Sequence, residues 1–280
     1  MKKIIAAFDG LKYSRSALDY AIFLSRYCNF HLVGIFLEDF TYNSYKIYDS
    51  IRKEDKRLNA KAKILEKRDA SARAACVSDF EAACQTAGLE FSIHRDRNIA
   101  TDDLVHETVF ADLLIVNSSE TLTHDAEKLP TRFIRDLLSD AHAPVLVVPR
   151  QFKPPEKLVL LYDGEPSSVH AIKMLSYTLS GLETMPVEII SVRAARDSSH
   201  IPENKLMKEF MKRHFPNASN TVIKGSATSD LPGYLAKQEK NCLVTLGAYG
   251  RGALSRWFRE SMADIIMKDL KLPLFIAHSK

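Results

Sequence analysis

The sequence predicts an α/β protein made of two doubly wound domains with mainly parallel sheets. Its strand-like segments, such as 4–8 and 158–162, are continuous apolar runs, which is typical of parallel strands that helices cover on both faces. Segments with helical apolar spacing separate these runs. The same layout occurs twice along 280 residues, a length that suits two domains better than one.

Each predicted half opens with one strand and one helix. The first strand ends at Asp9, and Ser14 can cap a helix whose apolar residues follow helical spacing. The unit recurs 154 positions later, where a strand ends at Asp163 and Ser167 can cap the next helix. We therefore expect an internal repeat.

The later strands also pair off between the halves. We expect the pairs 31–37 with 187–192, 111–116 with 241–246, and 144–148 with 273–277. Pro144 and Pro273 open the last pair and lie 129 positions apart. Because the offset shrinks from 154, the first half holds about 25 more residues.

Most of the extra residues belong to a charged segment at about 41–75. It holds ten Lys or Arg and five Asp or Glu, so its own net charge is +5. Because the whole chain has a net charge of +4, the remainder carries −1. The two signs are interleaved, so a solvated helical insertion is favoured over a nucleic-acid surface.

Two prolines mark the boundary between the halves. We expect domains at 1–150 and 157–280, joined by an extended linker at 151–156. The halves are expected to pack as a pseudo-dimer, and the two proline-led strands are candidate edges for pairing between them. A further homodimer stays open.

The composition is that of an ordinary globular protein, with 46% hydrophobic and 26% charged residues. The four cysteines have no metal-site spacing and are expected to be reduced thiols in a cytoplasmic protein. The apolar run after Lys3 is only five residues long, and no run approaches 18 residues, so neither a targeting segment nor a membrane span is expected.

One stretch near the end carries the strongest functional pattern. A short strand at 242–246 runs into three glycines within six positions, at 247, 250 and 252, and arginines 251, 256 and 259 follow. Glycines let backbone N–H groups approach a ligand, and Ser261 can cap a helix whose N-terminus favours anions. The spacing fits neither the P-loop nor the dinucleotide fingerprint.

The pattern Gly247-x-x-Gly250, nine residues, then Glu260-Ser261 resembles the nucleotide-binding signature of the universal stress proteins. That family has a third glycine where Glu260 stands. The Asp-Gly pair after the first strand and the proline-led last strand occur in both halves, so the resemblance covers nearly the whole chain. It implies a tandem universal stress protein with a Rossmann-like, adenine-nucleotide alpha-hydrolase-like fold.

The resemblance also implies a site for ATP or another adenine nucleotide in the second half. Asp163 would accept from the adenine or its neighbourhood, although an aspartate here could instead cap its own loop. The glycine loop could likewise be only a tight turn. The residues that would cradle or flank the ligand are Leu246, Gly247, Gly250, Glu260, Ser261 and Met262.

Glu260 is the unusual member of this set. A carboxylate 4 Å from a phosphate opposes binding by roughly 1 to 4 kcal/mol. The side chain could pair with Arg256 or Arg259, or it could help hold Mg²⁺ against the phosphates. The site could also take adenosine or AMP, or no ligand.

The first half is expected to have a degenerate site. An offset of 130 maps the four cradle positions to Asn117, Glu120, Pro130 and Thr131, so only the hydroxyl survives. Glu120 adds a negative charge, and we predict no triphosphate there.

No catalytic set is found. The nine histidines form no i, i+3 or i+4 pair, and there is no nucleophile elbow. The sequence therefore favours a non-enzymatic stress-response or regulatory protein that binds an adenine nucleotide and an unknown protein partner. The alternatives are an interaction module with a vestigial loop and, more weakly, a slow ATPase.

Overall fold

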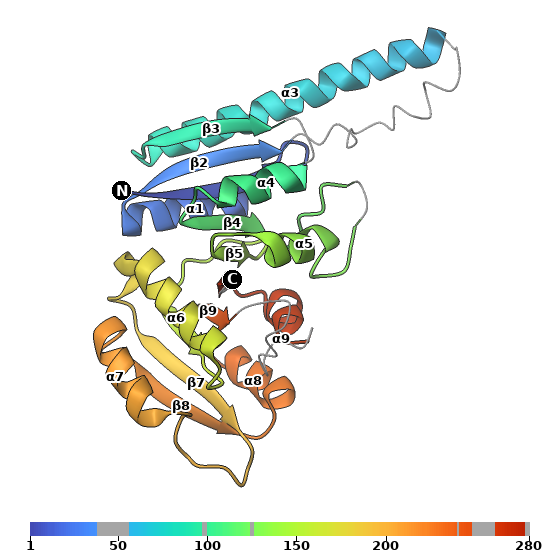
Figure 1. Ribbon diagram of the computed structural model, residues 1–280. Helices are drawn as coiled ribbons and strands as arrows, with labels where there is room; N and C mark the ends of the chain where they lie inside the picture. Colours follow the sequence, from blue (N-terminus) through green and yellow to red (C-terminus); the bar gives the residue numbers. More distant parts are fainter. Residues whose placement is uncertain (38–55, 97–99, 124–125, 240, 248–260, 278–280) are drawn as a thin grey trace.

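The structure is a computed structural model that describes residues 1–37, 56–96, 100–123, 126–239, 241–247 and 261–277. Within these residues the strands form one ten-stranded sheet in the order β3-β2-β1-β4-β5-β10-β9-β6-β7-β8. Figure 1 shows the sheet running from the blue and green first half into the yellow and red second half. The predicted α/β class with mainly parallel strands is confirmed.

Each half contributes five strands. The first half holds β1 (Lys2–Asp9), β2 (Phe30–Leu37), β3 (Phe91–Asp96), β4 (Leu113–Asn117) and β5 (Val145–Val148). The second half holds β6 (Lys157–Leu161), β7 (Val187–Arg193), β8 (Ser219–Lys224), β9 (Cys242–Gly247) and β10 (Leu274–Ala277). All pairings within a half are parallel.

The two halves join through their last strands. β5 and β10 pair antiparallel, with Leu146 opposite Phe275. The side chains of both strands are buried. The two proline-led strands thus pair with each other at the edges of their halves, and two five-stranded halves form one sheet.

Helices cover both faces of this sheet (Figure 1). One face carries α1 (Arg15–Cys28), α3 (Lys56–Thr86), α6 (Pro166–Thr178), the 3₁₀ turn η1 (Ser180–Leu182) and α7 (Asn204–His214). The other carries α4 (Ala100–Thr108), α5 (Arg132–Asp140), α8 (Ala227–Ala236), α9 (Ser261–Ile265) and the π-helix η2 (Ile266–Leu270). Each helical layer encloses its own hydrophobic cluster.

β5 shows why the strands at the centre of the sheet are mainly apolar. Leu146 and Val148 belong to the cluster on one face, and Val145 and Val147 belong to the cluster on the other. Side chains alternate between faces along a strand, and here both faces are covered, so every position of β5 is apolar.

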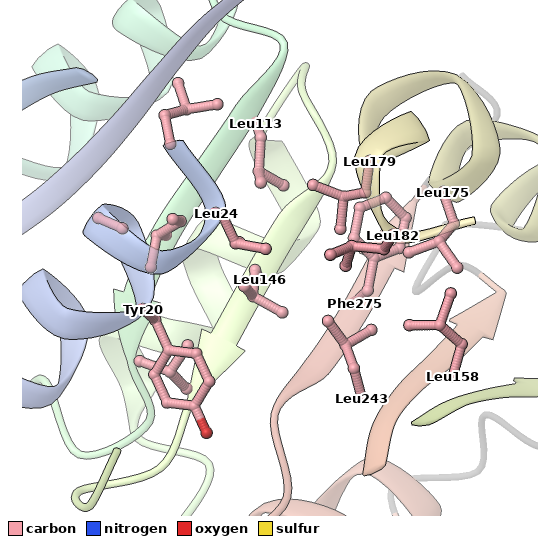
Figure 2. Close-up of a cluster of buried hydrophobic side chains, with 14 of the residues drawn as sticks. Tyr20, Leu24, Leu113, Leu146, Leu158, Leu175, Leu179, Leu182, Leu243 and Phe275 are labelled. Carbon is pink, nitrogen blue, oxygen red and sulfur yellow. The ribbon is translucent and has the colours of Figure 1, made fainter. Parts of the chain in front are cut away.

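The hydrophobic cluster under α1 and α6 continues across the join between the halves. Leu24 and Leu146 come from the first half, and Leu182 and Phe275 come from the second, all with no exposed surface. Figure 2 shows these side chains facing one another over β5 and β10. Full burial of side chains of this size contributes about 1.5 to 3 kcal/mol each, so the junction is a core rather than a loose contact.

The first predicted cap is confirmed. Ser14 precedes α1, and its side chain accepts a hydrogen bond from the Ala17 N–H at 3.3 Å. Asn29 closes the helix in the left-handed conformation, with φ at 54°, and its N–H donates to the Ser25 carbonyl. Both ends of α1 are therefore set by local residues.

The charged insertion contains the start of the long helix α3, which has 31 residues and spans about 46 Å. Its later part packs on the sheet through Val77, Phe80 and Cys84, whereas Ile64 is 68% exposed. Figure 1 shows the early part projecting beyond the sheet. The backbone of the predicted insertion is thus helical from residue 56 onward; residues 41–55 lie outside the described part.

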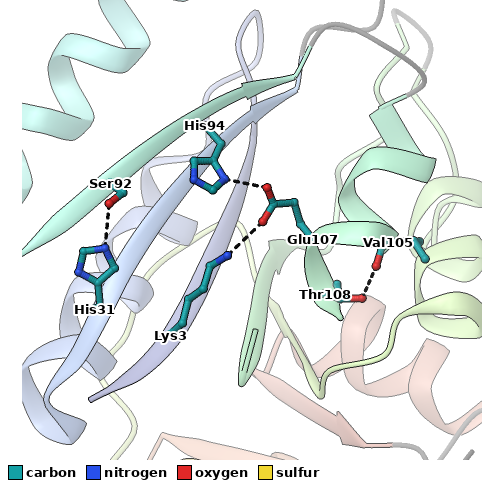
Figure 3. A network of polar contacts seen from close by, with 7 residues as sticks. All are labelled: Lys3, His31, Ser92, His94, Val105, Glu107 and Thr108. Atoms are coloured by element: carbon teal, nitrogen blue, oxygen red, sulfur yellow. Dashed lines mark hydrogen bonds and ion pairs between the residues drawn. The ribbon is translucent and has the colours of Figure 1, made fainter. Parts of the chain in front are cut away.

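Two ion-pair networks lie near the starts of β1 and β6, at opposite edges of the sheet because the two halves join antiparallel. The Lys3 ammonium contacts Glu107 at 3.1 Å, and His94 Nδ1 lies 2.7 Å from the same carboxylate (Figure 3). In the second half Lys157, 154 positions after Lys3, contacts the buried Glu188 at 2.6 Å. The first strand of each half therefore carries, at or next to its first residue, a lysine that pairs with a carboxylate.

Candidate functional site

Asp163 lies two residues after β6, at the edge where the parallel strands of the second half end. Its Oδ1 accepts a hydrogen bond from the Glu165 N–H at 3.0 Å. The intervening Gly164 has φ at +92°, which favours glycine. The carboxylate is partly exposed and shapes the loop before α6.

Asp9 makes the same turn in the first half. Its Oδ1 accepts from the Leu11 N–H at 2.7 Å, and the side chain is only 1% exposed. The two aspartates therefore share the loop-capping role that the sequence left open as an alternative. A role in ligand binding comes in addition to this turn and does not replace it.

Gly247 ends β9, the neighbour of β6 in the sheet, and Leu160 pairs with Thr245 in these two strands. Asp163 and Gly247 thus lie at the same edge, as expected for adjacent parallel strands. A Cβ at Gly247 would lie 2.6 Å from the Ser167 carbonyl carbon and from the Ser168 nitrogen. The glycine therefore lets the start of α6 pack directly on the end of β9.

The expectation that Ser167 caps the second helix is wrong. α6 begins at Pro166, its N-cap residue is Glu165, and no side-chain hydrogen bond closes that cap. Proline suits the first helical position because its φ is already helical and its missing N–H needs no acceptor there. Ser167 consequently lies inside the first turn and is 6% exposed.

The two halves differ in where the first helix begins. The offset of 154 maps Arg15, the first residue of α1, to Val169, so α6 begins three residues earlier than α1 does. This extra part of the turn lies against Gly247. In the first half, a side chain at the end of β4 fills the space that the backbone at the start of α6 fills in the second half.

That side chain is Asn117, the counterpart of Gly247. Its Nδ2 donates to Ser14 Oγ at 2.9 Å and to the Pro149 carbonyl at 3.3 Å. Its Oδ1 accepts from the N–H and the hydroxyl of Ser119. Asn117 therefore ties the end of β4 to the cap of α1, and the bare backbone that the resemblance implies at the second-half position is absent here.

A pocket of about 490 Å³ opens beside Asn117, and its lining includes Lys12, Arg15, Ser119, Glu120 and Arg150. Glu120 is 5% exposed and accepts from the N–H groups of Thr121 and Leu122 at 3.0 and 3.2 Å. Burial, with a further contribution from the charge of Asp9, raises the pKa of Glu120 to about 7. The fold therefore favours the neutral form of this carboxyl.

Thr131 has a structural role in this half. Its hydroxyl caps α5 by accepting from the Ile134 N–H at 3.2 Å, and it also donates to the Glu120 carbonyl. The side chain is 1% exposed. Thr131 is the only one of the four mapped positions that keeps a hydroxyl, and this hydroxyl is already hydrogen-bonded to backbone groups. This is the arrangement expected of a degenerate site.

The remaining predicted residues divide into two groups. The side chains of Leu246 and Met262 are 1% exposed and belong to the hydrophobic cluster, so only their backbone groups are available to a ligand. Ser261 is the first residue of α9. Gly250 and Glu260 lie outside the described residues.

Sequence reasoning missed the pocket cations Lys12, Arg15 and Arg150. They follow the ends of β1 and β5 in loops and at a helix start, and single lysines and arginines in loops carry no pattern. The offset of 130 did find Asn117 and Glu120, but it gave no sign that Glu120 is buried.

The described residues contain no group of three or more His, Cys, Asp or Glu that could hold a metal ion. None of the four cysteines forms a disulfide. None of the helices described is both long and apolar enough to cross a membrane.

No family model matches the sequence, and no curated protein matches it. Solved structures align along nearly its whole length. A universal stress protein from Archaeoglobus fulgidus DSM 4304 is 12% identical with a TM-score of 0.63, covering 99% of this chain and 98% of that chain.

Two chains from Pseudomonas aeruginosa are similar to the same extent. A functionally unknown protein from strain PAO1 is 14% identical with a TM-score of 0.63, covering 99% of this chain and 92% of that chain. A candidate universal stress protein from strain UCBPP-PA14 is 15% identical with a TM-score of 0.61, covering 99% and 93%. The chain therefore has the fold of the universal stress proteins, with two such halves in tandem in one polypeptide.

Proposed function

We propose that this protein is a non-enzymatic regulatory protein of the universal stress type whose second half binds an adenine nucleotide. ATP, AMP and adenosine are the candidate ligands. The bound state would alter which protein partner the chain recognises, and the expected place of action is the cytoplasm.

One observation carries this proposal. Asp163 and Gly247 end neighbouring parallel strands at the same edge of the sheet, the place where ligands bind in open α/β sheets. A partly exposed carboxylate there can accept from the N–H and O–H groups of a nucleoside. Glycine at the adjacent strand end keeps the edge free of a side chain.

Titration calorimetry with ATP, AMP and adenosine tests the proposal. Asp163→Ala removes the acceptor and should weaken binding at least about tenfold, since a hydrogen bond to a charged group contributes roughly 1.5 to 3 kcal/mol. Asp163→Asn is the matched control, because its Oδ1 can still accept from the Glu165 N–H and preserve the turn. Equal heats from the parent and Asp163→Ala would refute the proposal.

Glu260 decides how much of the phosphate chain the site holds. Its charge opposes a phosphate unless an arginine or Mg²⁺ neutralises it. Glu260→Gly should therefore raise the affinity for ATP more than that for adenosine. If Mg²⁺ bridges Glu260 and the phosphates, the same change should abolish the dependence of ATP binding on Mg²⁺.

A second function is favoured by the packing of the site. Asp163 already shapes a turn, and Gly247 is already required by the start of α6, so both residues have structural reasons to be present. This supports a protein-interaction module with a vestigial loop. Mass spectrometry of the freshly purified protein separates the two, because a stoichiometric nucleotide contradicts the module.

A slow ATPase is the weaker alternative, since no residue is nominated to position water. It requires phosphate release from the parent that exceeds release from the Ser261→Ala variant. Equal rates would remove it.

A further inference from the structure

A second cavity, of about 520 Å³, lies where the two halves meet. Its first wall is built by the end of β5 and the linker, including Pro149, Arg150 and Lys153. Its second wall is the π-helix η2 and the residues before β10. Because each wall comes from a different half, this cavity exists only in the tandem chain. Its volume is in the range of small-molecule sites.

The rim of this cavity carries charge of one sign. Arg150, Lys153, Lys268 and Lys271 line it with exposed side chains. No acidic residue lines it within the described ranges, and none of the four cations pairs with a carboxylate among those residues. Four unneutralised cations around one concave surface concentrate positive potential there.

The lining of the cavity combines aliphatic surface with polar groups. Leu129, Met267, Leu270 and Leu272 supply aliphatic surface. The buried Tyr20 donates its hydroxyl to the Lys153 carbonyl at 3.0 Å.

Asn241 holds the linker from the opposite half. Its Nδ2 donates to the carbonyls of Lys153 and Pro154 at 2.6 and 3.1 Å. Tyr20 from the first half and Asn241 from the second half thus both hydrogen-bond the linker backbone. These bonds fix the backbone from which the Lys153 side chain extends to the rim.

From this arrangement we infer that the junction cavity is a binding site for a small organic anion that carries two or more negative charges on an apolar body, such as an aryl phosphate ester. The apolar body packs against the leucines and Met267, and the anionic group meets the lysines. The multiple charge follows from the four cations, since a monoanion would leave most of them unpaired. This site is separate from the Asp163 edge and does not depend on the proposed nucleotide function.

Calorimetry with 1-naphthyl phosphate at pH 8 tests the inference, because the ester is then a dianion with a compact apolar body. We expect one ester per chain. Inorganic phosphate lacks the apolar body and 1-naphthol lacks the charge, so each should bind at least about tenfold more weakly. Equal binding of either fragment would overturn the proposed ligand class.

Charge variants locate the site. Lys268→Gln combined with Lys271→Gln should lower the affinity at least about tenfold, and Lys153→Gln should lower it from the other half. The matched control is Lys205→Gln with Lys212→Gln, two exposed lysines on α7, which should leave binding unchanged. Thermal unfolding of each variant checks that the fold is intact.

The Asp163→Ala variant separates this site from the nucleotide site. It should bind 1-naphthyl phosphate with the parent affinity. Loss of binding in Asp163→Ala, parent affinity in the Lys268/Lys271 variant, or equal losses in the α7 control would each overturn the assignment.

Discussion

Gly247→Ala tests whether the glycine at the end of β9 is required by packing. A methyl group at this position would lie 2.6 to 2.7 Å from three backbone atoms of Ser167 and Ser168. Backbone atoms cannot rotate away as a side chain can, so either the start of α6 or the end of β9 must shift.

The expected loss of stability follows from two opposing effects. Overpacking of this kind costs about 1 to 3 kcal/mol. Replacing glycine also reduces the conformational entropy of the unfolded chain, which stabilises the folded protein by roughly 0.4 to 1 kcal/mol. The variant should therefore unfold with a free energy about 1 to 2 kcal/mol below that of the parent, which corresponds to roughly 2 to 4 °C in Tm for each kcal/mol.

Urea unfolding of the protein without ligand measures this, and the chain offers a matched control. Gly233 lies inside α8, and a Cβ there would meet nothing within 4 Å. Gly233→Ala should stabilise the protein by up to about 1 kcal/mol, because alanine has the higher helix propensity. If Gly247→Ala is as stable as the parent or behaves like Gly233→Ala, the packing argument is refuted.

Three further changes probe other parts of the molecule. Phe275→Ala removes a fully buried ring at the junction of the halves and should lower the unfolding free energy by about 3 to 5 kcal/mol in urea unfolding; a loss below about 1 kcal/mol would contradict a continuous core. The pKa of Glu120 is raised to about 7 in the fold, so its ionisation weakens the folded state as pH rises from about 4.5 to 7. Glu120→Gln should therefore raise the free energy of unfolding by on the order of 2 kcal/mol relative to the parent at pH 8 and leave it unchanged at pH 4. Unfolding measured across this pH range tests this, and a difference that does not depend on pH would count against it. Burial raises the pKa of Glu107, but hydrogen bonds from Lys3 and His94 outweigh it and hold this pKa below the ordinary value. Glu107→Gln should therefore lower the unfolding free energy by about 1 kcal/mol at pH 7, and this loss should shrink as the pH falls and the carboxylate of the parent is protonated. A loss that stays constant with pH would point to the shape of the side chain rather than its charge.

The sequence predicts the interior strands well and the outer strands poorly. Runs such as 145–148 are apolar at every position because both faces of the sheet are covered. β8, by contrast, is an outer strand that has polar, exposed residues at both ends and only two apolar residues, Val222 and Ile223, both half-buried. Its backbone pairs with β7 without needing an apolar run, so no hydrophobic pattern marked it.

The site was predictable in position but not in its contacts. The repeat placed Asp163 and the glycine loop at the same edge, because strand order follows from the parallel plan. The contact between Gly247 and the first turn of α6 joins residues about 80 positions apart, and no local pattern reports it. Pro166 was the one available signal, since proline favours the first helical position and would have placed the start of α6 ahead of Ser167.

The pairing of β5 with β10 also bears on how the chain assembles after synthesis. A half on its own would present one of these strands as an unpaired row of backbone N–H and C=O groups flanked by exposed leucines, and such edges recruit other chains into aggregates. The edge of the first half is met by a strand of the same polypeptide only after β10 has been made, and β10 follows β5 by more than 100 residues. The nascent first half therefore keeps this edge of β5 open until β10 has been made, so β10 is the element that closes the aggregation-prone edge.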